Sequence, residues 1–226
     1  IEKYYLEKFQ KAFQDNDQML LYGPQNPDKK INIIPFNIKH KDRWLHPKFV
    51  TRLLNDLFGI QTRAGCLCAG PYGHRLLDID EELSGKYLHI LLSRGYSGIK
   101  PGWVRLNMHY TLSEKEFDYI VRAIKFIIDN GSKFLPFYEF NIKNGEWSNQ
   151  KDTDSTELRD QNLNQILANN DIFRKQLNNP DPEPDFGKIL NQAHSIADDL
   201  EEPQDFVTFD KEVEEVCVFY VCNLKD

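Results

Sequence analysis

The residues best suited to chemistry lie in a glycine-rich segment at residues 63–73, with the sequence RAGCLCAGPYG. Cys66 and Cys68 are separated by one residue and follow Arg63. A nearby guanidinium favours the thiolate form of a cysteine, and the thiolate is the nucleophilic form. Cys68 therefore has a setting that could favour the thiolate, with an inert loop thiol as the alternative. Cys66 is expected to be a neighbour and not a metal ligand, because two thiolates do not complete a zinc site.

A second set of polar residues alternates along residues 103–110. One face of an extended strand here carries Val104, Leu106, Met108 and Tyr110, and the other carries Arg105, Asn107 and His109. A planar guanidinium can hold a carboxylate through two parallel hydrogen bonds. Arg105 therefore has the chemistry to hold a carboxylate, and a structural ion pair is the other use open to it. Asn107 and His109 share its face as candidate binding residues, and His74 is a candidate at the mouth of the same site.

The flanking sequence supplies elements that could position these residues. An amphipathic helix is predicted over 1–22 and a strand over 31–38, where Pro35 indicates an edge or a bulge. Pro47 begins a helix that Gly59 ends, a short strand follows at 60–63, and the segment 64–73 is predicted to be a loop.

The next helix has the strongest local signals. Ser113 and Glu116 form a capping box ahead of apolar residues at helical spacing, and Asn130-Gly131 is expected to close the helix. The order of elements predicts an α/β layer. Both helices, at about 47–58 and 113–130, have a single apolar face, so we expect them on the same face of a small sheet.

The composition excludes several classes of partner. The chain is 40% hydrophobic, but no run approaches the length of apolar residues that a membrane span needs, so no membrane partner is expected. Residues 1–150 hold 21 Lys and Arg against 17 Asp and Glu, and residues 151–226 hold 7 against 18. Nucleic acid is not expected, because phosphate binding needs clustered cations. The four cysteines form neither a disulfide framework nor zinc-binding pairs, which indicates a reducing, intracellular compartment.

The final third of the chain differs in character. Residues 148–226 are predicted to be an acidic, partly irregular C-terminal extension, with a stiff linker at 179–184. We expect 150–205 to be poorly packed apart from one short helix near 163–177. Strand-like patterns at 206–209 and 216–222 suggest that the extension returns to a sheet edge or docks on a partner.

Two longer stretches carry a family resemblance. The sequence IIPFNIKHKDRWLHPKFVTRLLNDLFGIQTRAGCLCAGPYGHRLL at 33–77, followed by PGWVRLNMHYTLSEKEFDYIVRAI at 101–124, resembles the C-terminal small domain of class V aminotransferases and cysteine desulfurases. These enzymes are fold type I and depend on pyridoxal phosphate (PLP). The resemblance covers residues 1–147 and leaves 148–226 unexplained.

The resemblance implies a function for several residues. The RxGxxC loop of the desulfurases places the nucleophilic cysteine at Cys68, and the arginine that binds the substrate carboxylate corresponds to Arg105. PLP and its Schiff-base lysine belong to a preceding large domain, and His40-Lys41 is not expected to replace that lysine. The chain alone is therefore not expected to catalyse PLP chemistry, although the full-length protein would be a transferase or lyase acting on an amino acid.

The resemblance also implies partners. We expect a preceding large PLP-binding domain, a homodimer and an amino-acid substrate, and the helical pattern at Ile1 suggests a piece of a longer protein. The alternative is a non-catalytic scaffold that keeps the small-domain fold and binds a partner.

Overall fold

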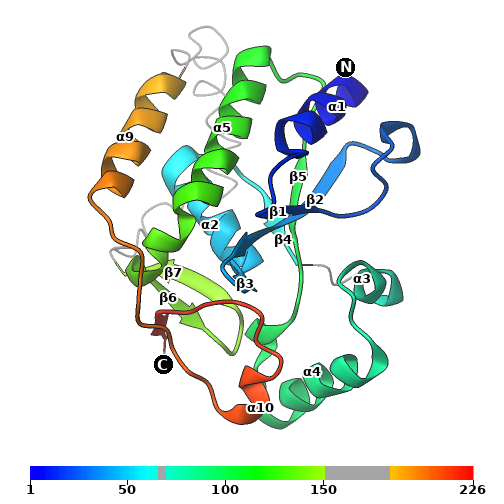
Figure 1. Cartoon of the computed structure of the whole chain (residues 1–226), viewed down its shortest axis with the longest axis vertical. Helices are drawn as coiled ribbons and strands as arrows, with labels where there is room; N and C mark the ends of the chain where they lie inside the picture. Colours follow the sequence, from blue (N-terminus) through cyan, green and yellow to red (C-terminus); the bar gives the residue numbers. More distant parts are fainter. Residues whose placement is uncertain (66–69, 151–183, 226) are drawn as a thin grey trace, which may run out of the picture.

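The computed structural model describes residues 1–65, 70–150 and 184–225, which form an α/β arrangement of two small sheets and surrounding helices (Figure 1). The larger sheet has the order β1-β2-β5-β4, with β3 paired to β2, and all its pairs are antiparallel. Its strands are β1 (Met19–Leu21), β2 (Ile33–His40), β3 (Arg43–Trp44), β4 (Arg63–Ala64) and β5 (Val104–Asn107).

The first helix is shorter than the sequence pattern predicted. Helix α1 spans Glu2–Phe13, and Leu20, predicted to be helical, lies in β1. The side chain of Asn16 accepts a hydrogen bond from the backbone N–H of Gln18 at 3.0 Å, so a local turn replaces the helix. The residues that follow are then free to pair with β2.

The prediction that Pro35 marks an edge or a bulge was wrong, because β2 lies inside the sheet between β1 and β5. Pro35 lies beyond the end of β1, next to Tyr22, whose backbone N–H donates to the Pro35 carbonyl at 2.9 Å. Pro35 has no backbone N–H to donate, but the residue opposite it, Tyr22, already lies beyond the last residue of β1. An internal strand accommodates proline there without losing a bond inside the β1–β2 ladder.

The two central helices are where the sequence predicted them. Helix α2 spans Pro47–Phe58 and ends at Gly59, which adopts the left-handed conformation, and α5 spans Glu114–Asn130 with the capping box at Ser113. The two helices contact each other and bury their apolar faces in one core with the inner face of the larger sheet, which confirms the layer. The α-helix ends at Asn130 as predicted, but Gly131 keeps the right-handed helical conformation. The chain therefore continues directly into the 3-10 helix η3 (Gly131–Phe137).

Helix α2 begins at a buried histidine. The His46 Nδ1 accepts a hydrogen bond from the backbone N–H of Lys48 at 3.1 Å, and its Nε2 lies 3.1 Å from the carbonyl oxygen of Gly98. The ring also packs edge-on against Phe219, with centroids 4.4 Å apart. Burial lowers the pKa of His46 to about 3, so the ring is neutral near pH 7.

Two helices follow the glycine-rich segment. Helix α3 spans Gly70–Leu76, so the prediction of a loop through residue 73 was wrong at its end. Pro71 suits a first helical turn, and the buried Gly73 needs little room. Helix α4 spans Glu81–Arg94, and the Asp80 carboxylate caps it by accepting from the backbone N–H of Leu83 at 2.7 Å. Two short 3-10 helices also occur: η1 (Pro27–Lys29) precedes β2, and η2 (Ser97–Ile99) follows α4.

The smaller sheet joins the middle of the chain to its C-terminal part. Strands β6 (Tyr138–Asn141) and β7 (Glu146–Asn149) form a hairpin, and β8 (Asn223–Leu224) pairs with β6 in parallel. Before β8 come α9 (Phe186–Asp198) and α10 (Lys211–Glu214). In Figure 1, α9 lies beside α5, and the following segment descends past the β6–β7 hairpin to α10 and then returns to the hairpin.

The C-terminal part is better packed than the sequence suggested. The prediction of poor packing through residue 205 was wrong for α9, which buries Leu190, Ala193 and Ala197 against the core. The predicted helix near 163–177 and most of the linker at 179–184 lie outside the described residues. Of the strand-like segments, 206–209 forms no strand, and 216–222 contributes a single bridge between Phe219 and Trp44 ahead of β8.

Candidate functional site

The larger sheet has one covered face and one open face. Ile34 and Phe36 of β2 and Val104 and Leu106 of β5 point into the core, where each is at most 3% exposed. The residues between them point the other way, as strand alternation requires. That open face lines a groove of about 820 Å³, to which β2, β4 and β5 contribute Ile33, Pro35, Arg63 and Arg105.

Two arginines lie directly opposite each other on this open face. Arg63 of β4 and Arg105 of β5 are partners in the antiparallel pairing, which brings their Cβ atoms to about 5 Å. Like charges at this position repel each other. Neither guanidinium has an ion pair or a hydrogen bond to any of the described residues, and no Asp or Glu among those residues lines the groove. The arrangement is therefore suited to an anion lying between or beside the two arginines.

Two lysines extend the positive charge along the groove. Lys29 and Lys30 lie in the segment that leads into β2. The Nζ of Lys30 is buried and has no hydrogen-bond partner in the described part of the chain. Burial lowers the pKa of Lys30, and no carboxylate offsets that effect. The groove thus carries four basic side chains, and one of them is poorly hydrated.

Aromatic rings form the far wall of the groove. Tyr22 and Trp103 lie with ring centroids 5.9 Å apart, and Tyr72 of α3 reaches across to Gly23. The hydroxyl of Tyr22 accepts a hydrogen bond from Nδ2 of Asn37 at 3.0 Å. Burial raises the pKa of Tyr22 to about 12, so the Tyr22 hydroxyl adds no negative charge near neutral pH.

The structure brings only some of the predicted site residues together. Arg105 lines the groove and is half-buried, opposite the apolar face, as the alternation required. His74 is on α3 but does not line the groove. Asn107 and His109 line a separate groove near the start of α5 and α9, and the His109 Nδ1 lies 2.8 Å from the Thr111 hydroxyl. Cys68 and Cys66 lie outside the described residues.

Sequence reasoning missed several residues of the groove. Lys30, Tyr22 and Trp103 were not singled out, and Arg63 was noted only as a neighbour of Cys68. A signal existed for Trp103, which has the same parity as Arg105 along the strand. For Tyr22 no local signal existed, because its position depends on how β1 and β2 pair.

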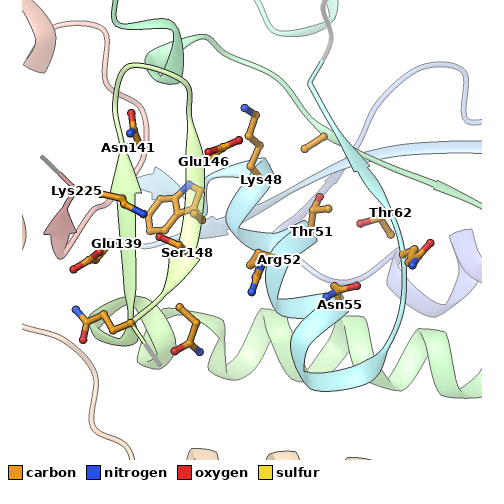
Figure 2. A pocket seen from close by; sticks show the side chains of 15 residues that line it. Lys48, Thr51, Arg52, Asn55, Thr62, Glu139, Asn141, Glu146, Ser148 and Lys225 are labelled. Atoms are coloured by element: carbon orange, nitrogen blue, oxygen red, sulfur yellow. The ribbon is translucent and has the colours of Figure 1, made fainter. Parts of the chain in front are cut away.

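A second groove, of about 980 Å³, lies between α2 and the β6–β7 hairpin. Figure 2 shows Lys48, Thr51, Arg52 and Asn55 on the α2 side and Glu139 and Glu146 on the hairpin. Of its three basic side chains, Lys48, Arg52 and Lys225, the first two are already satisfied within the fold. The Lys48 Nζ donates to the carbonyl of Asn144 at 2.8 Å, and the Arg52 Nε donates to the Asp56 carboxylate at 2.7 Å. This groove is polar but offers less unsatisfied charge than the first.

Comparison with known proteins does not identify the chain. No protein-family model matches it, and neither does any curated protein sequence. Across residues 1–65, 70–150 and 184–225, none of the helices has the length and apolar character to cross a bilayer. Those same residues contain no cluster of three or more His, Cys, Asp or Glu side chains that could hold a metal ion.

Proposed function

We propose that this chain is the C-terminal small domain of a PLP-dependent enzyme of the class V aminotransferase and cysteine desulfurase type. In this proposal Arg105 binds the carboxylate of an amino-acid substrate. The observation that carries it is the position of Arg105, which presents a guanidinium without a described partner to an open groove. A bidentate pair with a substrate carboxylate would use both the charge and the planar shape of that group.

The surroundings of Arg105 favour this proposal over a scaffold. A structural arginine would be expected to pair with a nearby carboxylate, because a partly buried charge without a partner is unfavourable. Arg105 instead faces Arg63, and the described lining of the groove contains no acidic side chain. A fold kept only for binding a protein partner through its acidic extension has no need of this arrangement.

The side chains that line the groove are suited to bind a substrate carboxylate, but they do not form a complete binding site for PLP. The described lining of the groove contains no carboxylate that could pair with the pyridine nitrogen of PLP. The proposal therefore assigns PLP to a preceding large domain and expects a homodimer. When bound, PLP would supply the electron sink for chemistry at the substrate α-carbon. This chain would fix the carboxylate end and so orient that carbon.

The proposed reaction class has two versions. In a desulfurase, the Cys68 thiolate would attack the substrate sulfur. An S–S bond would form as the C–S bond breaks, and the bonding electrons would stay with the carbon fragment, which is then protonated. In an aminotransferase, Cys68 would have no chemical role. Release of sulfur from cysteine by the full-length protein and by its Cys68→Ala variant separates the two versions.

The central test uses the full-length protein. We expect visible absorbance from bound PLP and activity on an amino acid. Arg105→Lys should raise KM by about tenfold or more, because lysine keeps the charge but loses the two-pronged hydrogen bond. Arg75→Lys on α3, where the side chain is exposed, is the matched control and should leave KM unchanged. A protein that binds no PLP would refute the proposal, and an unchanged KM in Arg105→Lys would refute the role of Arg105.

A further inference from the structure

We infer that the groove selects an amino acid with an aromatic side chain, and that Tyr72 is the residue that recognises its ring. This inference rests on the proposed function, in which Arg105 holds the α-carboxylate. It starts from the lining of the groove, because one part of that lining is cationic and another part is aromatic. The side chains of Tyr22, Trp103 and Tyr72 supply the aromatic part.

The strand pairing places the aromatic part beside Arg105. Pro35 is the partner of Arg105 in the pairing of β2 with β5, and the backbone N–H of Tyr22 donates to the carbonyl of Pro35 at 2.9 Å. Since neighbouring strands lie about 4.8 Å apart, the backbone of Tyr22 is about 10 Å from that of Arg105. Trp103 precedes Arg105 by two residues and points to the same face, and its ring centroid lies 5.9 Å from that of Tyr22. The long side chain of Arg105 can cover part of this distance, and an amino acid with one ring covers the rest.

The floor of the groove between these groups is low and apolar. Pro35 has no hydrogen-bonding side chain. Gly65 lies opposite Trp103, where the Gly65 N–H donates to the Trp103 carbonyl at 3.0 Å, and it has no side chain that could cover the indole from that side. A flat apolar ring can lie on this floor, whereas a polar group would find no hydrogen-bonding side chain in Pro35 or Gly65.

Tyr72 offers a ligand the largest aromatic surface of the three rings. It is 55% exposed, whereas Tyr22 and Trp103 are 6% and 7% exposed. Tyr72 reaches from α3 over the sheet, because its hydroxyl oxygen lies 3.9 Å from the position that a Cβ would take at Gly23. Leu76 lies one turn further along α3 and lines the same groove. A ligand ring between Tyr72 and the floor would gain more than its buried area alone accounts for, since aromatic rings also attract each other through their quadrupoles.

The test compares three carboxylates that share one end and differ at the other: 3-phenylpropionate, 3-cyclohexylpropionate and propionate. None of them has an amino group that could react with PLP, so titration calorimetry on the full-length protein reports binding alone. We expect 3-phenylpropionate to bind at least about tenfold more tightly than propionate, which requires burial of only about 60 Å² of apolar surface. An aromatic side chain can bury roughly 150 Å² or more. 3-Cyclohexylpropionate should bind at least about twofold more weakly than 3-phenylpropionate, because it lacks the aromatic attraction.

Three variants locate the preference at Tyr72. Tyr72→Ala should reduce the preference for 3-phenylpropionate over propionate to about threefold or less and leave propionate binding unchanged. Tyr72→Phe keeps the ring and should keep the preference. Tyr110→Ala removes a tyrosine that is similarly exposed, at 58%, but does not line this groove, and it should leave all three affinities unchanged.

Four outcomes overturn the inference: no binding of 3-phenylpropionate, equal affinities for it and propionate, equal affinities for it and 3-cyclohexylpropionate, or a preference that survives Tyr72→Ala. The proposed function is judged separately, by PLP absorbance of the full-length protein and by Arg105→Lys. An enzyme that binds PLP and needs Arg105, but does not prefer the aromatic ligand, would keep the proposed function and lose this inference.

Discussion

The buried His46 predicts a measurable loss of stability between pH 7 and pH 5. Its pKa of about 3 in the folded chain lies below the ordinary value of 6.5, because burial disfavours the charged ring. The unfolded chain therefore binds an additional proton at pH values between these two. Stability from this histidine is complete above pH 6.5 and is lost as the pH falls toward 3.

The size of the effect follows from the same pKa. Since pH 5 lies about 1.5 pH units below the unfolded pKa and each unit is worth about 1.4 kcal/mol, His46 should cost about 2 kcal/mol at pH 5. Urea unfolding, followed by tryptophan fluorescence at pH 7 and pH 5, measures this difference.

Two variants isolate the contribution of His46. His46→Asn can still cap α2 through its side chain, and it cannot titrate in this range. Its free energy of unfolding should be lower at pH 7, but the loss between pH 7 and pH 5 should shrink by about 2 kcal/mol relative to the parent protein. His89→Asn changes an exposed histidine on α4 and should leave the pH dependence as it was. The reasoning is refuted if His46→Asn loses as much stability between the two pH values as the parent does.

The remaining predictions concern the room beside two glycines and the cap of α5, and thermal unfolding measures the change in stability for each variant. A Cβ added at Gly98 would lie 2.7 Å from the carbonyl oxygen of Ile142, so Gly98→Ala should destabilise by about 1–3 kcal/mol. Gly85→Ala is the matched control on α4, where a Cβ meets nothing within 4 Å, and it should stabilise by about 0.5–1 kcal/mol; an equal effect of the two changes would contradict the geometry. Ser113→Ala removes the side-chain cap of α5 and should cost about 1 kcal/mol, whereas no change in melting temperature would show that the capping box contributes nothing.

Local patterns predicted the central layer well, because they report directly on burial. Residues 104, 106 and 108 are buried as their alternation required, and α2 and α5 begin and end near their cap signals. The pattern failed at Tyr110, which is exposed because β5 ends at Asn107 and the chain then turns through His109 and Thr111. A run of alternating residues does not reveal where pairing stops.

The candidate site was harder to predict, because pairing between distant residues assembles it. Arg105 was identified from its own strand, but the position of Arg63 opposite it depends on the pairing of β4 with β5. Tyr22 joins the groove because β1 pairs with β2, which brings Tyr22 beside Pro35. Each segment of the sequence shows its own basic residues, but it does not show that these residues line the same groove.

The packing of residues 213–221 against Trp44 and Tyr87 has a consequence for how the molecule reaches its native state. Residues 213–221 fill the core beside Trp44 and Tyr87, and the Tyr87 hydroxyl donates to the carbonyl of Val216 at 2.9 Å. These contacts join segments made early in synthesis to segments made late. Contacts of such high sequence separation slow folding, because a long loop must close before they form. During synthesis, Trp44 and Tyr87 therefore remain without these native partners until residues 213–221 have been made, and a chaperone would find them exposed in that interval.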